Sequence, residues 1–159
     1  MTDHVPDIIN FIGKIIERGQ GYQIDDGSVY FDNSLKSYGH FVDISGDPEV
    51  KLRKGQKHQS DFALWKAVKP DEPFWESPWG KGRPGWHIEC STMASKLFGP
   101  VLDFHSGGID LMFPHHQNEE AQSCSYHGHN QWVNYWIHAG LLTKFFFIIV
   151  TLNLIFLIF

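Results

Sequence analysis

Cysteine is scarce in this chain, which has only Cys90 and Cys124 among its 159 residues. Two widely separated thiols do not make the disulfide framework of a small secreted domain, so they indicate a reducing compartment. The start of the chain also lacks a basic stretch followed by an apolar core, and we therefore predict no signal peptide. We expect a cytoplasmic protein, with an organelle as the alternative.

A basic excess is lacking as well. The chain carries 13 Lys and Arg against 18 Asp and Glu, which gives a formal net charge of −5. A protein that binds nucleic acid by itself usually has many more basic than acidic residues, and this balance argues against that class. Eight of the 13 basic residues nevertheless lie between Lys51 and Arg83. This basic strip fits either a contact with a phosphate backbone or a solvated loop.

Long hydrophobic runs are absent except at the end of the chain, although the hydrophobic content of 42% is that of a folded protein. Residues 145–159 contain no charge, and Thr151 and Asn153 are their only polar side chains. A helix of this length would span about 22 Å, which is short of the ~30 Å core of a bilayer. Three interpretations stay open: non-native translated sequence, a marginal membrane anchor, or a buried strand or helix.

Apolar residues recur at helical spacing near the start and predict an amphipathic helix over residues 1–20. Pro6 suits its first turn and Gly19 suits its end. Beyond an Asp26-Gly27 turn signal, four further segments are expected. They are a strand at 28–31, an irregular surface excursion at 33–60, a short apolar run at 61–68, and a Pro- and Gly-rich loop without regular structure at 70–85.

A second helix is expected over about residues 86–97 and a third over about residues 114–127. Between them, residues 101–104 read as a buried strand that Gly107 and Gly108 end. The order helix, strand, Gly-rich turn, helix is typical of an α/β fold. In such folds, ligands gather at the carboxyl ends of the strands.

Three potential metal ligands stand out in this region: Cys90, His115 and Glu119. His115 and Glu119 are four residues apart, so a helix places them on one face. A thiolate, an imidazole and a carboxylate together form a zinc ligand set. The same spacing also fits a buried free cysteine with a polar helix face. On spacing alone, His116 and Glu120 are equally available ligands.

Two further features border these residues. Trp86 lies four residues before Cys90, so one helical face carries both, and an indole there fits either a pocket wall or a core side chain. After the predicted strand, Gly107 and Gly108 let backbone amides approach a ligand, and Asp110 offers a carboxylate to ribose hydroxyls. A Gly-Gly pair also occurs in ordinary turns, so this signal is weak by itself.

Four segments of the sequence have an unusual composition: DFALWK at 61–66, SPWGKGRPGWHIECS at 77–91, DFHSGGIDLMFPHH at 103–116 with Asn118-Glu119 after it, and VNYWIHAG at 133–140. These segments resemble the signature segments of cysteinyl-tRNA synthetases. The likeness covers about residues 3–143 in the right order. It implies a class I aminoacyl-tRNA synthetase, an α/β protein with part of a Rossmann-type catalytic domain and the end of its connective insertion.

The resemblance also implies a role for each site residue. Three of the family's four zinc ligands correspond to Cys90, His115 and Glu119, and the zinc in this family binds the thiolate of the substrate cysteine. The cysteine pocket corresponds to Trp86 and His105, and the nucleotide-binding stretch to Gly107, Gly108 and Asp110. The implied substrates are cysteine, ATP and cysteine tRNA.

The departures from the family pattern bear on activity. The resemblance divides the chain into the end of the connective insertion at 1–60, the second half of the catalytic domain at 61–143, and an apolar tail outside the pattern at 144–159. The fourth zinc ligand, a cysteine, and the His-Ile-Gly-His-type motif belong to a segment that these 159 residues do not contain. No Lys-Met-Ser-Lys-Ser loop is found either. We therefore expect no aminoacylation by this chain alone.

Two other readings stay open. The chain fits a stand-alone zinc-binding or interaction module whose fourth ligand is His87, His116 or water. It also fits a membrane-tethered fragment, a reading that depends wholly on residues 145–159.

Overall fold

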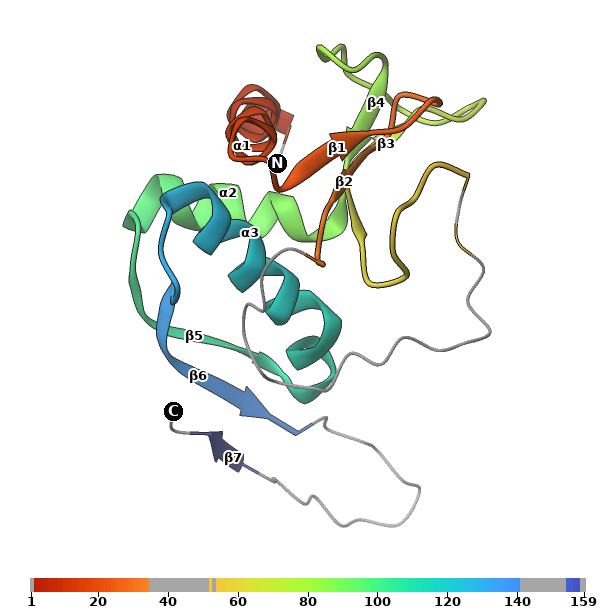
Figure 1. Cartoon of the computed structure of the whole chain (residues 1–159). Coiled ribbons are helices and arrows are strands. Elements are labelled where there is room, and N and C mark those ends of the chain that lie inside the picture. Colours follow the sequence, from red (N-terminus) through yellow and green to blue (C-terminus); the bar gives the residue numbers. More distant parts are fainter. Residues whose placement is uncertain (1, 35–51, 53, 141–153, 158–159) are drawn as a thin grey trace.

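The computed structural model describes residues 2–34, 52, 54–140 and 154–157 (Figure 1). Most of the predicted surface excursion and most of the apolar tail therefore lie outside the described residues. Within the described part of the chain, no helix has both the length and the apolar character needed to cross a membrane.

Four short strands form an antiparallel sheet in the order β1-β2-β3-β4. Their bounds are Gly21–Gln23, Val29–Phe31, Phe62–Ala67 and Gly82–Pro84. The predicted turn joins β1 to β2, and Gly27 there has a φ of 90°, a conformation that glycine adopts without steric cost. The turn and the strand predicted after it are confirmed.

The prediction of an irregular loop over 70–85 was wrong at its end, because β4 pairs with β3 there. A Cβ atom on Gly82 would lie 2.3 Å from the indole Nε1 of Trp65. One on Gly85 would lie 2.0 Å from the carbonyl oxygen of Ala63. Glycine at these positions therefore allows the segment to come close enough to β3 to pair. A Pro- and Gly-rich pattern usually indicates a loop, so it did not predict this strand.

The three predicted helices are confirmed. They are α1 Val5–Glu17, α2 Trp86–Phe98 and α3 Gln117–His127, with short helical turns η1 Thr2–His4, η2 Ile109–Leu111 and η3 Met112–His116. The periodic apolar residues of α1 form its buried face: Val5, Ile8, Phe11, Ile12 and Ile15. Glycines with positive φ end the other two helices, with a φ of 85° at Gly99 and 79° at Gly128.

A second sheet contains β5 Leu102–Gly108, β6 Val133–Ala139 and β7 Leu154–Leu157, in that order. β5 and β6 are parallel, and η2, η3 and α3 connect them along the chain. This strand–helix–strand crossover is the unit of α/β folds, so the predicted class is confirmed. β7 pairs antiparallel with β6, which places four residues of the apolar tail in a strand.

The strand after α2 differs from the prediction in both length and burial. It begins at Leu102 and continues through Gly107 and Gly108, which stay in the ladder with β6 instead of ending the strand. Leu102 is its only buried residue. Phe104 is 65% exposed and stacks on Tyr135 of β6. An apolar run in the sequence does not reveal which face of a strand is covered.

One hydrophobic core joins the helices to both sheets. Its buried members include Ile8, Ile12, Phe31, Trp65, Ile88, Cys124, Trp132 and Trp136. In Figure 1, α2 and α3 lie between the antiparallel sheet and the β5–β6 pair. α1 contacts both α2 and α3, and Phe11 stacks on Tyr126 with ring centroids 3.8 Å apart. The helices that carry the predicted site are therefore supported by α1.

The close approach at Gly85 leads to a first prediction. Gly85→Ala should lower the free energy of unfolding by about 1–3 kcal/mol, because the new Cβ meets the backbone of β3. Gly13→Ala in α1 is the matched control, since a Cβ there would have no atom from another part of the chain within 4 Å, and it should be neutral or stabilising by up to about 1 kcal/mol. Urea unfolding followed by circular dichroism measures both; equal stability of the two variants would contradict the prediction.

Candidate functional site

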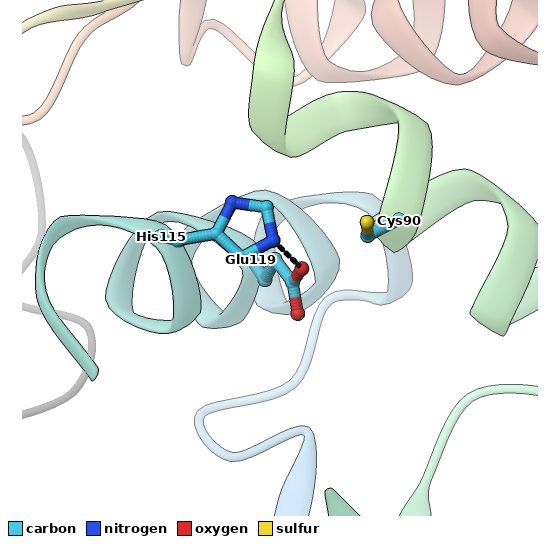
Figure 2. A group of neighbouring side chains, drawn as sticks. All are labelled: Cys90, His115 and Glu119. Carbon is cyan, nitrogen blue, oxygen red and sulfur yellow. Dashed lines mark ion pairs between the residues drawn. The ribbon is translucent and has the colours of Figure 1, made fainter. Parts of the chain in front are cut away.

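Two helical segments hold the three predicted metal ligands. Cys90 lies one turn into α2, His115 lies in η3, and Glu119 lies in the first turn of α3. Their ligand atoms all lie within 4.8 Å of one another. Figure 2 shows Cys90 on one helix and the His115–Glu119 pair on the other. The packing of α2 on α3 therefore brings together residues that are distant in the sequence.

Glu119 links this group to the parallel sheet. Its Oε1 lies 2.7 Å from Nε2 of His115, and its Oε2 is hydrogen-bonded to Nε2 of His105 on β5. The side chain is only 1% exposed. His105, His116 and Glu119 form a second group whose ligand atoms lie within 4.8 Å of one another. Among the described residues, Glu119 is the member that both groups share.

Burial and hydrogen bonding act on Glu119 in opposite directions. Burial raises the pKa of its carboxyl group, but hydrogen bonds from His105 and His115 outweigh burial and lower the pKa to about 2. Burial, and after it the charge of Glu119, raises the pKa of the Cys90 thiol to about 12. At neutral pH the metal-free group therefore combines an ionised carboxylate with a protonated thiol.

These residues fit a divalent cation of the zinc type. Thiolate, imidazole and carboxylate are the side chains that zinc prefers. A cation between them would compensate the buried charge of Glu119 and favour the thiolate form of Cys90. The chemistry of the donor atoms, more than their spacing in the sequence, identifies this as a candidate metal site.

Aromatic rings border the group on the side of α2. Trp86, the first residue of α2, stacks on His115 with ring centroids 4.5 Å apart and is 53% exposed. His87 is buried, and its Nδ1 lies 2.8 Å from Nδ1 of His115. Burial lowers the pKa of His87 to about 4, so its ring is neutral at neutral pH. A half-exposed indole beside a potential ligand can form the wall of a small pocket.

The glycine pair lies next to the histidines. A Cβ on Gly107 would lie 2.7 Å from Cε1 of His116, so glycine leaves room for that ring. His116 in turn has its Nδ1 2.7 Å from Nε2 of His138 on β6. Asp110 is exposed in η2, two residues after Gly108. Packing gives a reason for glycine at position 107, and the nucleotide contacts of Gly107, Gly108 and Asp110 stay predictions.

Sequence reasoning missed the pairing of His116 with His138. The signal needed was the parallel register of β5 and β6, which sets Gly107 opposite His138. The sequence also offers His87 and His116 as possible fourth metal ligands. In the part of the chain that the structure describes, neither joins the group formed by Cys90, His115 and Glu119.

The lowered pKa of Glu119 leads to a prediction about how the stability of the metal-free chain depends on pH. Its folded pKa of about 2 lies below the ordinary value of 4.5, so its charge stabilises the fold above pH 4.5, and this contribution is lost as the pH falls toward 2. A shift of this size corresponds to roughly 3 kcal/mol. With a chelator present, the free energy of unfolding should fall more steeply between about pH 6 and 2 for the unaltered chain than for Glu119→Gln. Parallel declines in urea unfolding would be evidence against this role.

Comparison with known proteins agrees with the geometry. A family model described as the tRNA synthetases class I (C) catalytic domain matches residues 1–144. The cysteine–tRNA ligase of Aeropyrum pernix is 53% identical over 148 residues, which cover 90% of this chain and 31% of the relative. The probable mitochondrial cysteine–tRNA ligase of Xenopus tropicalis is 54% identical over 145 residues, which cover 89% of this chain and 25% of the relative.

The cysteine–tRNA ligase of Saccharolobus solfataricus is 48% identical over 149 residues and again covers 90% of this chain and 31% of the relative. The chain thus spans less than a third of the length of these three relatives. The matched region includes both helical segments of the candidate metal site and the strand that carries His105. The chain therefore belongs to the cysteine–tRNA ligase family of class I synthetases and corresponds to part of its catalytic domain.

Proposed function

We propose that this chain contributes the cysteine-binding part of a cysteine–tRNA ligase, which activates cysteine with ATP and transfers it to cysteine tRNA. The observation that carries the proposal is the convergence of Cys90, His115 and Glu119 beside the half-exposed Trp86. Zinc held by these residues would bind a small thiol, and the indole of Trp86 would form an apolar wall beside it.

The proposed cofactor is one zinc ion, held by Cys90, His115 and Glu119 with a fourth ligand from outside this group. Zinc bound there supplies a Lewis-acidic centre that prefers the thiolate of cysteine to the hydroxyl of serine, so that selectivity needs no second editing site. Glu119 is already ionised for ligation. Cys90 has to release its thiol proton before it can ligate.

In this proposal, neighbouring side chains orient the metal ligand Glu119 and line the pockets for cysteine and ATP. His105 holds Oε2 of Glu119, which leaves Oε1 facing His115. Trp86 presents its indole beside His115, where the substrate side chain would lie. At the carboxyl end of β5, backbone amides of Gly107 and Gly108 and the exposed carboxylate of Asp110 are the proposed contacts of ATP.

We also propose the three parts that the sequence suggested: 1–60 as the end of the connective insertion, 61–143 as the second half of the catalytic domain, and 144–159 as an apolar tail outside the family pattern. The shared core and the pairing of β2 with β3 join the first two parts closely. The insertion would therefore be continuous with the catalytic domain on the side of α1 and the antiparallel sheet.

Cysteine tRNA is the proposed macromolecular partner, but part of the basic strip forms ion pairs within the chain. Three of its cations form ion pairs: Lys57 with Asp32, Lys81 with Glu76, and Arg83 with Glu72. These pairs favour a solvated surface over a phosphate contact for those three residues.

We propose a cytoplasmic location, in keeping with the scarcity of cysteine in the sequence; an organelle is the alternative, since one relative is named as mitochondrial.

The two cysteines provide a matched test of the zinc site. Cys90→Ser should weaken the binding of Zn²⁺ roughly 100-fold or more, since changes to residues around metal ligands alone commonly cost 10–100-fold. Cys124→Ser should bind zinc like the unaltered chain, because Cys124 is buried against Glu120, outside the site. Competition with a chromophoric chelator gives the affinities, and the thiolate-to-metal absorption of the Co²⁺ form should disappear only in Cys90→Ser. Equal zinc affinities in the two variants would remove the basis of the proposal.

The activity of the 159 residues alone is a separate prediction. The family motifs that contact ATP phosphates are not found in this sequence, and loss of a single group that stabilises transition-state charge typically costs about 10²–10³ in rate. The purified polypeptide should therefore show no cysteine-dependent exchange between ATP and pyrophosphate. A full-length relative assayed in parallel is the positive control, and exchange above background by the polypeptide would refute the prediction.

A further inference from the structure

His87 and His115 meet through the same nitrogen of their rings. Nδ1 of His87 lies 2.8 Å from Nδ1 of His115, and both side chains are buried. Two imidazole nitrogens this close attract each other when one carries a proton and the other accepts it, whereas two bare or two protonated nitrogens repel. One ring is therefore the donor and the other is the acceptor.

The other nitrogen of His115 identifies the donor. Nε2 of His115 lies 2.7 Å from Oε1 of Glu119, within the group that also includes Cys90. A metal binds the bare nitrogen of a neutral imidazole, so ligation through Nε2 keeps the ring proton of His115 on Nδ1. Nδ1 of His87 is then the bare, accepting nitrogen.

We propose that His87 is a positioning residue for the metal site: with the metal bound, it accepts a hydrogen bond from Nδ1–H of His115 and so fixes the ring orientation of that ligand. The inference rests on the proposed function for the identity of the metal. Ligating histidines usually donate their second N–H to a carboxylate, a backbone carbonyl or water. An imidazole in this place orients the ligand without adding a second negative charge next to Glu119.

The ring of His87 is held firmly enough to act as a fixed acceptor. It packs edge-on against Phe62 of β3, with centroids 5.7 Å apart and an interplanar angle of 85°. The ring of Trp86 also lies beside it, with centroids 5.0 Å apart. The first turn of α2 thus carries a pocket-wall residue, the positioning residue and the ligand Cys90 within five positions. A shift of α2 would disturb all three together.

Two variants of the full chain separate hydrogen bonding from packing. His87→Asn keeps an accepting oxygen near the position of Nδ1, and His87→Leu has nearly the same branched shape without an acceptor. Both lose the ring contacts with Phe62 and Trp86, so the difference between them reports the hydrogen bond. We expect His87→Leu to bind Zn²⁺ about 10–100-fold more weakly than the unaltered chain in chelator competition, and His87→Asn to recover most of that loss.

Nitrogen-15 NMR of the imidazole rings adds a readout that packing alone does not change. Without zinc, Nε2 of His115 carries its proton toward the ionised carboxylate of Glu119, so the bare Nδ1 of His115 should accept from Nδ1–H of His87. Zinc should move the proton of His115 to Nδ1 and leave Nδ1 of His87 bare, so the tautomer of His87 should change when zinc binds. Equal zinc affinities for the Asn and Leu variants, or a tautomer of His87 that does not change when zinc binds, would overturn the inference. A failure of the unaltered chain to bind zinc would overturn the proposed function instead.

Discussion

The candidate site depends on a carboxylate that is withdrawn from water and still ionised. Burial opposes the charge of Glu119, and imidazoles from β5 and η3 make that charge favourable. These two partners come from different elements, so the charge links the parallel sheet to the helices. An unpaired charge in the same position would be strongly unfavourable, which makes the histidines part of the fold as well as of the site.

The antiparallel sheet determines where the other half of the site begins. Gly85 donates its backbone N–H to the carbonyl of Leu64 on β3 over 2.8 Å, and α2 starts at the next residue. The absence of a side chain at Gly85 allows this contact. The position of Cys90 relative to His115 therefore depends on how closely the end of β4 approaches β3.

Local patterns in the sequence predicted the helices well, because their signals are local. The spacing of apolar residues defined the buried face of α1, and glycines with positive φ ended α2 and α3. Pairing between distant segments was harder to predict from the sequence. The Pro- and Gly-rich pattern indicates a loop where β4 lies, and the exposure of Phe104 and the partner of His116 depend on the register of β5 with β6, which no local pattern contains.

The ligand set shows the same limit. Spacing alone could not separate Glu119 from Glu120, and the family resemblance made that choice. The structure supplies a physical reason for it: Glu120 accepts the backbone N–H of Trp132 over 2.7 Å, and burial raises its pKa. Two adjacent carboxyl groups thus have opposite surroundings, one facing the histidines and one facing the core.

The stacking of Trp86 on His115 also gives the site an optical signal of its own. Indole emission responds to water and to contact with a neighbouring ring, and Trp86 is half-exposed and stacks on a potential ligand. Trp65, Trp132 and Trp136 are buried, and Trp75 and Trp79 are partly buried. Intrinsic fluorescence of this chain therefore contains a component that reports the occupancy of the site directly, without a label and without any turnover.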